Sequence, residues 1–385
     1  WDAISKTSPD SLHSTTENAS HTNLSTEHPY ERHIGLLHHI SAHQGRDVHH
    51  CFTFSGFTLM LTIHNAHLKA SISTLGAEMH ALTVIDSGRS IIWHGDETFW
   101  RGHSPILFPL VGSAWNGTLR HEGREYHLPK HGIVRQREWH VVEHRSDSVT
   151  LAIENRPEDL EQFPWPFRLE VTYSLHHRTL HVDFNVKNLS TRSTMWFQIG
   201  GHPSIMLPTP LRAEGDQLTQ EINPFSLVPS PASVNNKPVG YLRFEGTPHS
   251  LLRASTQGCT EPQRIHIPWN KDAATSKALA SNHHFNALVP LTIDTFAHEA
   301  LIFDQHQVTA IHVLDAKEQR IARVVSSAPA WLVWAPTNLP SPFICCEPWY
   351  GLPDQQGFLG DWQDRPHVQH ASPGTTWHGW YNIEV

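Results

Sequence analysis

The sequence predicts an all-β protein, a sandwich of largely antiparallel sheets. Most apolar residues fall in short segments rich in β-branched and aromatic side chains, and Gly, Pro, Asn or Asp separates these segments. Long helical periodicity is nearly absent. Many short strands joined by regular turns are typical of a sandwich. With 385 residues, the chain is long enough for one large all-β domain or two ordinary ones.

Residues 1–55 are predicted to form a flexible extension. They are rich in His, Ser, Thr and Asn and lack a sustained apolar period, so little apolar burial would offset the entropy lost on ordering. The predicted sandwich domain occupies 56–385. Its first part, 57–88, alternates apolar and polar residues over two strands and ends at the turn Asp86-Ser87-Gly88.

The rest of the domain repeats this pattern. Residues 148–154 and 167–188 are interpreted as a meander that builds a broad sheet. Further strands are expected in SIIWHG, REYHLP, WHVVEH, MWFQIGG, ALIFD, AIHVLD, RIARVV and AWLVWAP. The stretch 209–290 is rich in Pro, Ser and Asn, and we expect it to be an elaborated loop region with few strands on the same domain.

Composition argues against several classes of partner. The formal net charge is -9 and 17% of the residues are charged, so the basic surface that binds nucleic acid or anionic membranes is not expected. No apolar run approaches the roughly 20 residues that span a bilayer. Four cysteines, of which Cys345 and Cys346 are adjacent, favour reduced core thiols and a cytoplasmic location. Four N-x-[ST] sequons leave a secreted protein as the alternative.

The 33 histidines raise the question of a metal. Metal sites need ligands at converging spacings, and the sequence contains no HExxH, no CxxC and no Cys/His ladder. Histidine pairs are scattered through tails and turn-like segments and are interpreted as surface residues. We therefore expect neither a dedicated metal site nor a cofactor.

Three motifs stand out. In ICCEPWYG, residues 344–351, an apolar segment delivers Glu347, either as an edge charge in water or as a buried charge with a purpose. His131 lies in LPKHGIVRQREW and His202 in FQIGGHPSI. Taken singly, His131 reads as a turn histidine and His202 as a residue of a β-bulge, since short motifs match often by chance.

Taken in chain order with SPILFPLVGSAWNG, LGAEMHAL, WHGD, FPWPFRLEVTYSL and ALIFD, these motifs resemble the aldose 1-epimerase (galactose mutarotase) family. The likeness is greatest to its shorter bacterial-type branch and covers roughly 57–385. The resemblance implies a β-supersandwich whose concave face binds a sugar. Its H-G-[FI]-x-R motif falls on His131 and Arg135, its G-x-H-P motif on His202, and its C-x-E-P-W motif on Glu347.

The reaction that the resemblance implies is the interconversion of α and β anomers. It removes a proton from the C1 hydroxyl and protonates the ring oxygen, so that the ring opens, C1 turns and the ring recloses. Glu347 is the expected base, because partial burial raises the pKa of a carboxylate, and His202 the expected acid. His131 would orient or polarise the sugar. Glu347 would sit at a strand end, with Trp349 as a flat apolar wall for the substrate.

Two departures from the family pattern affect the substrate. Family members usually carry an arginine directly after the V-G of F-P-x-V-G, where it contacts sugar hydroxyls, and this chain has Ser113. The family's aspartate in D-A-L-I-F is replaced by Glu299, which is one methylene longer. Both leave the acid and the base in place but change the groups expected to bind the sugar.

The resulting hypothesis is a cofactor-independent isomerase acting on an aldohexose or a related monosaccharide. Two alternatives stay open. One is a non-catalytic carbohydrate-binding or sugar-sensing protein, which Ser113 favours. The other is a hexose-phosphate mutarotase, which would need an Arg/Lys cluster to hold the phosphate. The preferred sugar and the oligomeric state do not follow from the sequence.

Overall fold

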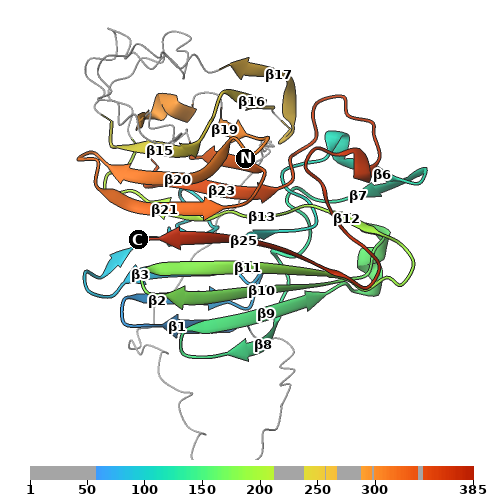
Figure 1. Ribbon diagram of the computed structural model, residues 1–385, viewed down its shortest axis with the longest axis horizontal. Helices are drawn as coiled ribbons and strands as arrows, with labels where there is room; N and C mark the ends of the chain where they lie inside the picture. The colour runs from blue at the N-terminus through green and yellow to red at the C-terminus, as the bar shows by residue number, and fades with distance from the viewer. Residues whose placement is uncertain (1–57, 212–237, 256, 267–287, 297–298, 337–340) are drawn as a thin grey trace, which may run out of the picture. The chain divides into compact units, whose positions relative to one another are not determined.

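The computed structural model describes residues 58–211, 238–255, 257–266, 288–296, 299–336 and 341–385. The predicted extension, residues 1–55, lies outside them, so its boundary stays a prediction. Thr53–Val385 groups as one compact unit. Among the described residues the regular structure consists of β-strands and short 3-10 helices (Figure 1).

The largest sheet has nine strands, which cross the view in Figure 1. In spatial order they are β18 (Leu288–Leu291), β15 (Gly240–Gly246), β20 (Val308–Asp315), β21 (Arg320–Ser326), β25 (Thr376–Glu384), β11 (Thr179–Asn188), β10 (Phe167–His176), β9 (Ser148–Glu154) and β8 (His140–His144).

The second sheet positions the candidate site. Its order is β17 (Thr260–His266), β16 (Ser250–Ala254), β19 (Ala300–Phe303), β22 (Ala330–Trp334), β23 (Phe343–Tyr350), β13 (Ile199–Gly201) and β5 (Ile106–Leu107), and β14 (Ser204–Met206) also pairs with β23.

Smaller elements complete the described fold. A four-stranded sheet contains β1 (Met60–His64), β2 (Leu68–Ser73), β3 (Met79–Val84) and β4 (Arg89–Ser90), and β1 contacts β9 and β10. Two-stranded sheets pair β6 (Thr118–His121) with β7 (Arg124–His127) and β12 (Met195–Phe197) with β24 (Gln369–Ala371). The 3-10 helices are η1 (Trp115–Gly117), η2 (Pro157–Glu161), η4 (Ile293–Phe296) and η5 (Trp362–Asp364).

Alternation of apolar and polar residues explains how the sheets pack. In β10 the residues Leu169, Val171 and Tyr173 are buried, and the residues between them are only half-buried. In β11 the alternation continues through Val182 and Phe184. Successive strand residues point to opposite faces, so one face of this hairpin enters the main hydrophobic core. The pairings between the named strands are antiparallel, which confirms the predicted all-β, largely antiparallel sandwich.

The stretch 209–290 was predicted to be an elaborated loop region with few strands on the same domain. Its described parts contain β15, β16 and β17 and the start of β18. These strands extend both large sheets at one end. Apolar residues such as Leu242, Phe244 and Leu251 are buried in the main core, and this burial outweighs the Pro-rich and Ser-rich composition. The remaining residues of the stretch lie outside the described part of the chain.

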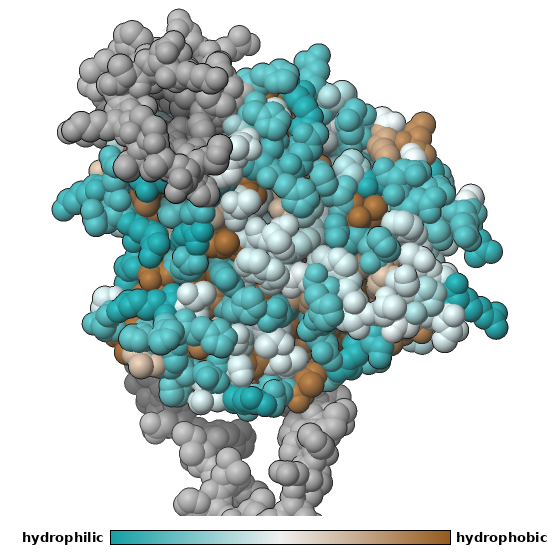
Figure 2. Space-filling view, in the orientation of Figure 1, coloured by the Kyte–Doolittle hydropathy of each residue, from teal (hydrophilic) through white to brown (hydrophobic). Residues whose placement is uncertain are grey.

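The surface seen in Figure 2 is largely hydrophilic or neutral, and hydrophobic residues lie on it as separated spots. Isolated apolar residues are normal on a protein surface. This face therefore offers no broad apolar patch to a partner. No helix in the described part of the chain has the length and apolar character needed to span a membrane.

Candidate active site

Glu347 lies in the middle of β23, on the face that points away from the main core. Ile344, Cys346 and Tyr350 belong to the main hydrophobic cluster. Phe343, Cys345 and Trp349 pack in two smaller clusters. Because strand residues alternate between faces, Glu347 projects with this second set. The expectation that Glu347 ends a strand is wrong, because β23 continues to Tyr350. The side chain is 0% exposed, so this is a buried carboxyl group and not an edge charge.

His202 stands opposite Glu347 across the sheet. It lies between β13 and β14, and both of these short strands pair with β23 in the same register, Gly200 with Trp349 and Ser204 with Cys345. That register, carried through position 202, sets His202 against Glu347. The Nε2 atom of His202 lies 3.2 Å from Oε1 of Glu347. Neither carboxyl oxygen of Glu347 has a partner with hydrogen-bond geometry.

Glycines allow this close arrangement. A Cβ atom at Gly200 would fall 2.6 Å from the Trp349 ring, and one at Gly201 would fall 2.6 Å from the Tyr381 ring. Side chains at these positions would force β13 away from its neighbours. The two glycines before His202 therefore keep the histidine within reach of Glu347.

His131 occupies a tightly held turn beside this pair. Its φ of 66° is left-handed, which is uncommon for a residue other than glycine. Its backbone N–H donates to Gly112 O at 2.9 Å, and the backbone N–H of Gly112 donates to His131 Nδ1 at 3.2 Å. Nδ1 is thus an acceptor, and the neutral ring carries its proton on Nε2. The ring centre of His131 lies 5.9 Å from that of His202 and 6.1 Å from that of Trp349.

Burial sets the protonation of all three groups. It raises the pKa of Glu347 well above its usual 4.5, and the charge of Lys130 and the Trp349 indole act in the opposite direction. Burial, together with the charges of Lys130 and Arg135, lowers the pKa of His202 to about 3. Burial also lowers the pKa of His131 well below 6.5. At pH values between the lowered pKa of His202 and the raised pKa of Glu347, this pair holds one proton, which rests on the carboxyl group of Glu347.

Lys130 is a site residue that the sequence interpretation missed. Its positive charge lowers the pKa of His131, His202, Glu347 and Glu299. One lysine that acts on all four groups lies in the same region as they do, since such interactions fall off with distance. Arg135, which the motif predicted, also lowers the pKa of both histidines. The structure thus brings Arg135 and Glu299 to the same region as the predicted acid and base.

Ser113 faces Lys130 across a glycine. A Cβ atom at Gly258 would lie 2.7 Å from Ser113 Oγ and 3.6 Å from Lys130 Cε, so both side chains converge there. The backbone N–H of Ser113 donates to Gly258 O at 3.1 Å. The position that family members fill with an arginine therefore has a cationic side chain close by.

Glu299 shares one feature with His131, a left-handed backbone, and another with Glu347, an unpartnered carboxyl oxygen. Its φ of 73° is again left-handed, and one carboxyl oxygen, Oε2, is buried without a hydrogen-bond partner. Burial raises its pKa, against the lowering effect of Lys130. Strained backbone and unpartnered polar atoms gather at functional sites more often than elsewhere.

The aromatic residues differ in part from the expectation. Trp349 is only 2% exposed and packs with Leu107, Val111 and Leu352 behind the site. It is a supporting residue in the sugar-free protein, and its predicted role as a wall for the substrate stays a prediction. Trp100, which is half-buried, stacks on His202 with ring centres 4.9 Å apart and an angle of 27°.

Among the residues that the structure describes, two groups of side chains have metal-ligand composition. His202, Cys345 and Glu347 lie within ligand distance of one another, but burial raises the pKa of both Cys345 and Glu347, so both hold protons that a metal would have to displace. The second group, Glu78, His80 and His103, lies in a separate cluster.

Comparison with known proteins shows the family and the fold to which the chain is similar. The family model described as aldose 1-epimerase matches residues 59–384. The LacX protein of Lactococcus lactis subsp. lactis is 26% identical over 333 residues, which cover 85% of this chain and 99% of LacX. A galactose mutarotase related enzyme from Lactobacillus acidophilus has a TM-score of 0.69 at 24% identity, covering 85% of this chain and 97% of its own.

A galactose mutarotase-like protein from Lactobacillus casei gives a TM-score of 0.68 at 25% identity, covering 84% of this chain and 99% of its own. The predicted galactose mutarotase-like supersandwich is therefore confirmed as the fold.

Proposed function

The chain belongs to the aldose 1-epimerase family, and from this premise we propose that it interconverts the α and β anomers of an aldohexose or a related sugar. The observation that supports the proposal most directly is the Glu347–His202 pair, with 3.2 Å between Oε1 and Nε2. Anomer interconversion needs one group that takes a proton and one that gives a proton, and this pair holds a single proton between two such groups.

Glu347 acts as the base on the C1 hydroxyl, and His202 acts as the acid on the ring oxygen. In the sugar-free protein the proton of the pair rests on Glu347, so it must pass to His202 before the ring opens. The short distance permits direct transfer. A sugar hydroxyl that donates to the carboxylate stabilises its charged form and so favours the transfer.

Ring closure reverses these steps. After rotation about the C1–C2 bond, Glu347 returns its proton to the C1 oxygen while His202 recovers the proton from the ring oxygen. No net proton enters or leaves the site. Each group thus alternates between acid and base within one catalytic cycle, and such groups typically contribute about 10²- to 10⁴-fold to the rate.

The surrounding residues bind and orient the sugar. His131 presents an Nε2 proton, since its Nδ1 accepts from Gly112, and can donate a hydrogen bond to a hydroxyl or to the ring oxygen. Lys130 and Arg135 offer charge-assisted hydrogen bonds, and Glu299 offers an acceptor. Trp100, stacked on His202, presents an aromatic face of the kind that packs against the C–H face of a pyranose.

Polarimetry of freshly dissolved α-glucose and α-galactose tests the proposal. The wild-type protein should accelerate the change in rotation. Glu347→Gln should reduce the acceleration at least about 100-fold, while calorimetry should show sugar binding within a few fold of wild type. Glu158→Gln, at an exposed residue of η2, is the matched control and should keep full activity.

Two results would contradict the proposal. A wild-type rate in Glu347→Gln would remove Glu347 from the role of base. A wild-type protein that binds monosaccharides but accelerates none of them would instead be a sugar-binding protein on the same fold.

A further inference from the structure

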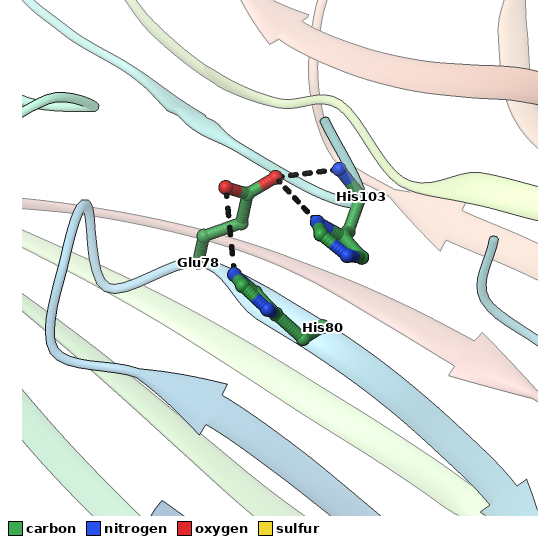
Figure 3. A group of neighbouring side chains, drawn as sticks. All are labelled: Glu78, His80 and His103. Carbon is green, nitrogen blue, oxygen red and sulfur yellow. Dashed lines mark hydrogen bonds and ion pairs between the residues drawn. The ribbon is translucent and has the colours of Figure 1, made fainter. Parts of the chain in front are cut away.

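A second cluster of chemically reactive side chains lies at the start of β3. Glu78 directly precedes this strand, His80 lies in it, and His103 lies just before β5. Figure 3 shows both imidazole rings turned toward the carboxyl group of Glu78. The mechanism above uses none of the three residues.

The three side chains face one another at ion-pair distance but form no hydrogen bonds with one another. His80 Nε2 lies 3.8 Å from Glu78 Oε2, and His103 Nδ1 lies 3.7 Å from Glu78 Oε1. These distances are too long for hydrogen bonds. His103 Nδ1 is buried and has no hydrogen-bond partner. Such an orphaned nitrogen is unfavourable unless something else occupies the space between the donors.

The backbone holds the carboxyl group in a fixed orientation. The N–H groups of His103 and Ser104 donate to Glu78 Oε1 at 2.6 and 3.0 Å. Oε2 is therefore turned toward His80 and keeps its lone pairs for another ligand. Hydrogen bonds that orient a ligating carboxylate in this way are a regular part of metal sites.

We propose that Glu78, His80 and His103 bind one Zn²⁺ ion. One oxygen and two imidazole nitrogens lie within 4.8 Å of one another, so closure together with reorientation of the rings brings all three to the roughly 2.0–2.2 Å at which Zn²⁺ binds these atoms. The nitrogen donors favour zinc over Mg²⁺ or Ca²⁺, which prefer oxygen ligands.

The rings provide the closure. The His80 and His103 rings now stack 3.8 Å apart at 11°, and coordination requires them to tilt until both ring planes contain the ion. His80 can tilt because its side chain is 31% exposed. The same exposure leaves a fourth position open to water. The ion would join β3 to the segment before β5. We therefore expect it to stabilise the fold.

Zinc titration of the full chain, with a chromophoric chelator as competitor, tests the proposal. The 33 histidines provide weak background sites, so the measurement is the difference between variants. Wild type should show one tight site per chain that Glu78→Gln, His80→Gln and His103→Gln each lose. His67→Gln is the matched control, because His67 pairs with His177 at 6.3 Å between ring centres and should keep the tight site.

Two further readouts complete the test. Co²⁺ added to the metal-free wild type should give the visible absorption bands of a tetrahedral site, and His80→Gln should lack them. Zinc should raise the melting temperature of wild type by roughly 2–4 °C and leave that of His80→Gln unchanged. If His103→Gln fails to fold, the more exposed His80→Gln decides the result. Equal zinc affinity and stoichiometry in wild type and His80→Gln would overturn the proposal.

Discussion

His202 Nε2 lies 3.2 Å from Glu347 Oε1, in a pair of which Glu347 is 0% and His202 8% exposed. The register of β13 and β14 on β23 creates this contact, and burial moves the two pKa values in opposite directions. The pair therefore keeps one proton over a wide range of pH. This relationship leads to the first two predictions.

The first prediction concerns the pH profile of kcat/KM for anomer interconversion. Below about pH 3, where His202 is also protonated, no base remains. Above the raised pKa of Glu347, neither group holds a proton and no acid remains. The profile should be a broad bell that does not fall between pH 7 and pH 5. An acid limb near 6.5 would instead mean that His202 titrates like an imidazole in water.

The second prediction concerns stability. The folded protein holds the Glu347 proton more tightly than the unfolded chain, so this contribution is complete below pH 4.5 and is lost as pH rises through the folded pKa. Gln has no such proton. The stability of Glu347→Gln relative to wild type should grow by about 1.4 kcal/mol per pH unit within that window.

Thermal unfolding followed by circular dichroism at several pH values would measure this difference. Glu158→Gln, at an exposed position, should show a difference that does not change with pH. A flat difference for Glu347→Gln as well would show that the Glu347 pKa is not raised.

Ser113 and Lys130 lead to the third prediction. A cationic side chain that contacts the sugar strengthens binding of the ground state and of the transition state alike. Its gain or loss therefore changes KM more than kcat. Lys130→Gln should raise KM for an aldohexose about tenfold to hundredfold, as expected when about 1.5–3 kcal/mol of charge-assisted hydrogen bonding is lost. Ser113→Arg should lower KM, and by more in the Lys130→Gln protein, where no like charge opposes the arginine.

Steady-state kinetics on the two single variants and the double variant would measure this coupling. Ser87→Arg, in an exposed turn, serves as the control. An unchanged or higher KM in Ser113→Arg, in both backgrounds, would mean that position 113 is shaped for a different ligand.

Sequence alone predicted the parts of the site that depend on short-range pattern. Strand alternation and turn residues predicted the sandwich, and the resemblance to the aldose 1-epimerase family, carried by three motifs in chain order, predicted Glu347, His202 and His131 as site residues. The remainder depends on which segments meet in space. Lys130 precedes His131 in the chain, but the direction of a lysine side chain follows from the fold. In the proposed zinc site, Glu78 and His103 are distant in sequence and meet only through strand packing.

The wrong expectation at Glu347 has the same origin, because strand length also depends on the segments that pair with it. The motif around Glu347 suggested a strand end, but β23 continues past Glu347 to Tyr350. In the structure Pro348 lies within β23 and stands opposite Trp331 of β22. Likewise, the composition of 209–290 does not show that Leu242, Phe244 and Leu251 are buried in the main core. Composition describes a segment in isolation, whereas burial depends on its neighbours.

The last prediction concerns an ion pair away from the site, in which Asp304 is buried and Arg264 is half-buried. Arg264 donates to Asp304 through Nη1 at 2.6 Å and Nη2 at 2.5 Å. Burial alone would raise the pKa of Asp304, but Arg264, together with His367, outweighs it and lowers the pKa to about 2. The stability from this pair is thus present above the unfolded pKa of 3.8 and is lost as pH falls through about 2. Asp304→Asn should lose about 2 kcal/mol at pH 7.

Urea unfolding of Asp304→Asn and wild type between pH 7 and pH 2 would measure this loss. The difference should shrink toward the acid end, because protonated Asp304 no longer pairs with Arg264 as a charge. Asp147→Asn, at an exposed residue, should change stability by less than about 0.5 kcal/mol at every pH. If the Asp304→Asn difference stayed constant down to pH 2, the stabilisation would come from packing and neutral hydrogen bonds and not from the charge of Asp304.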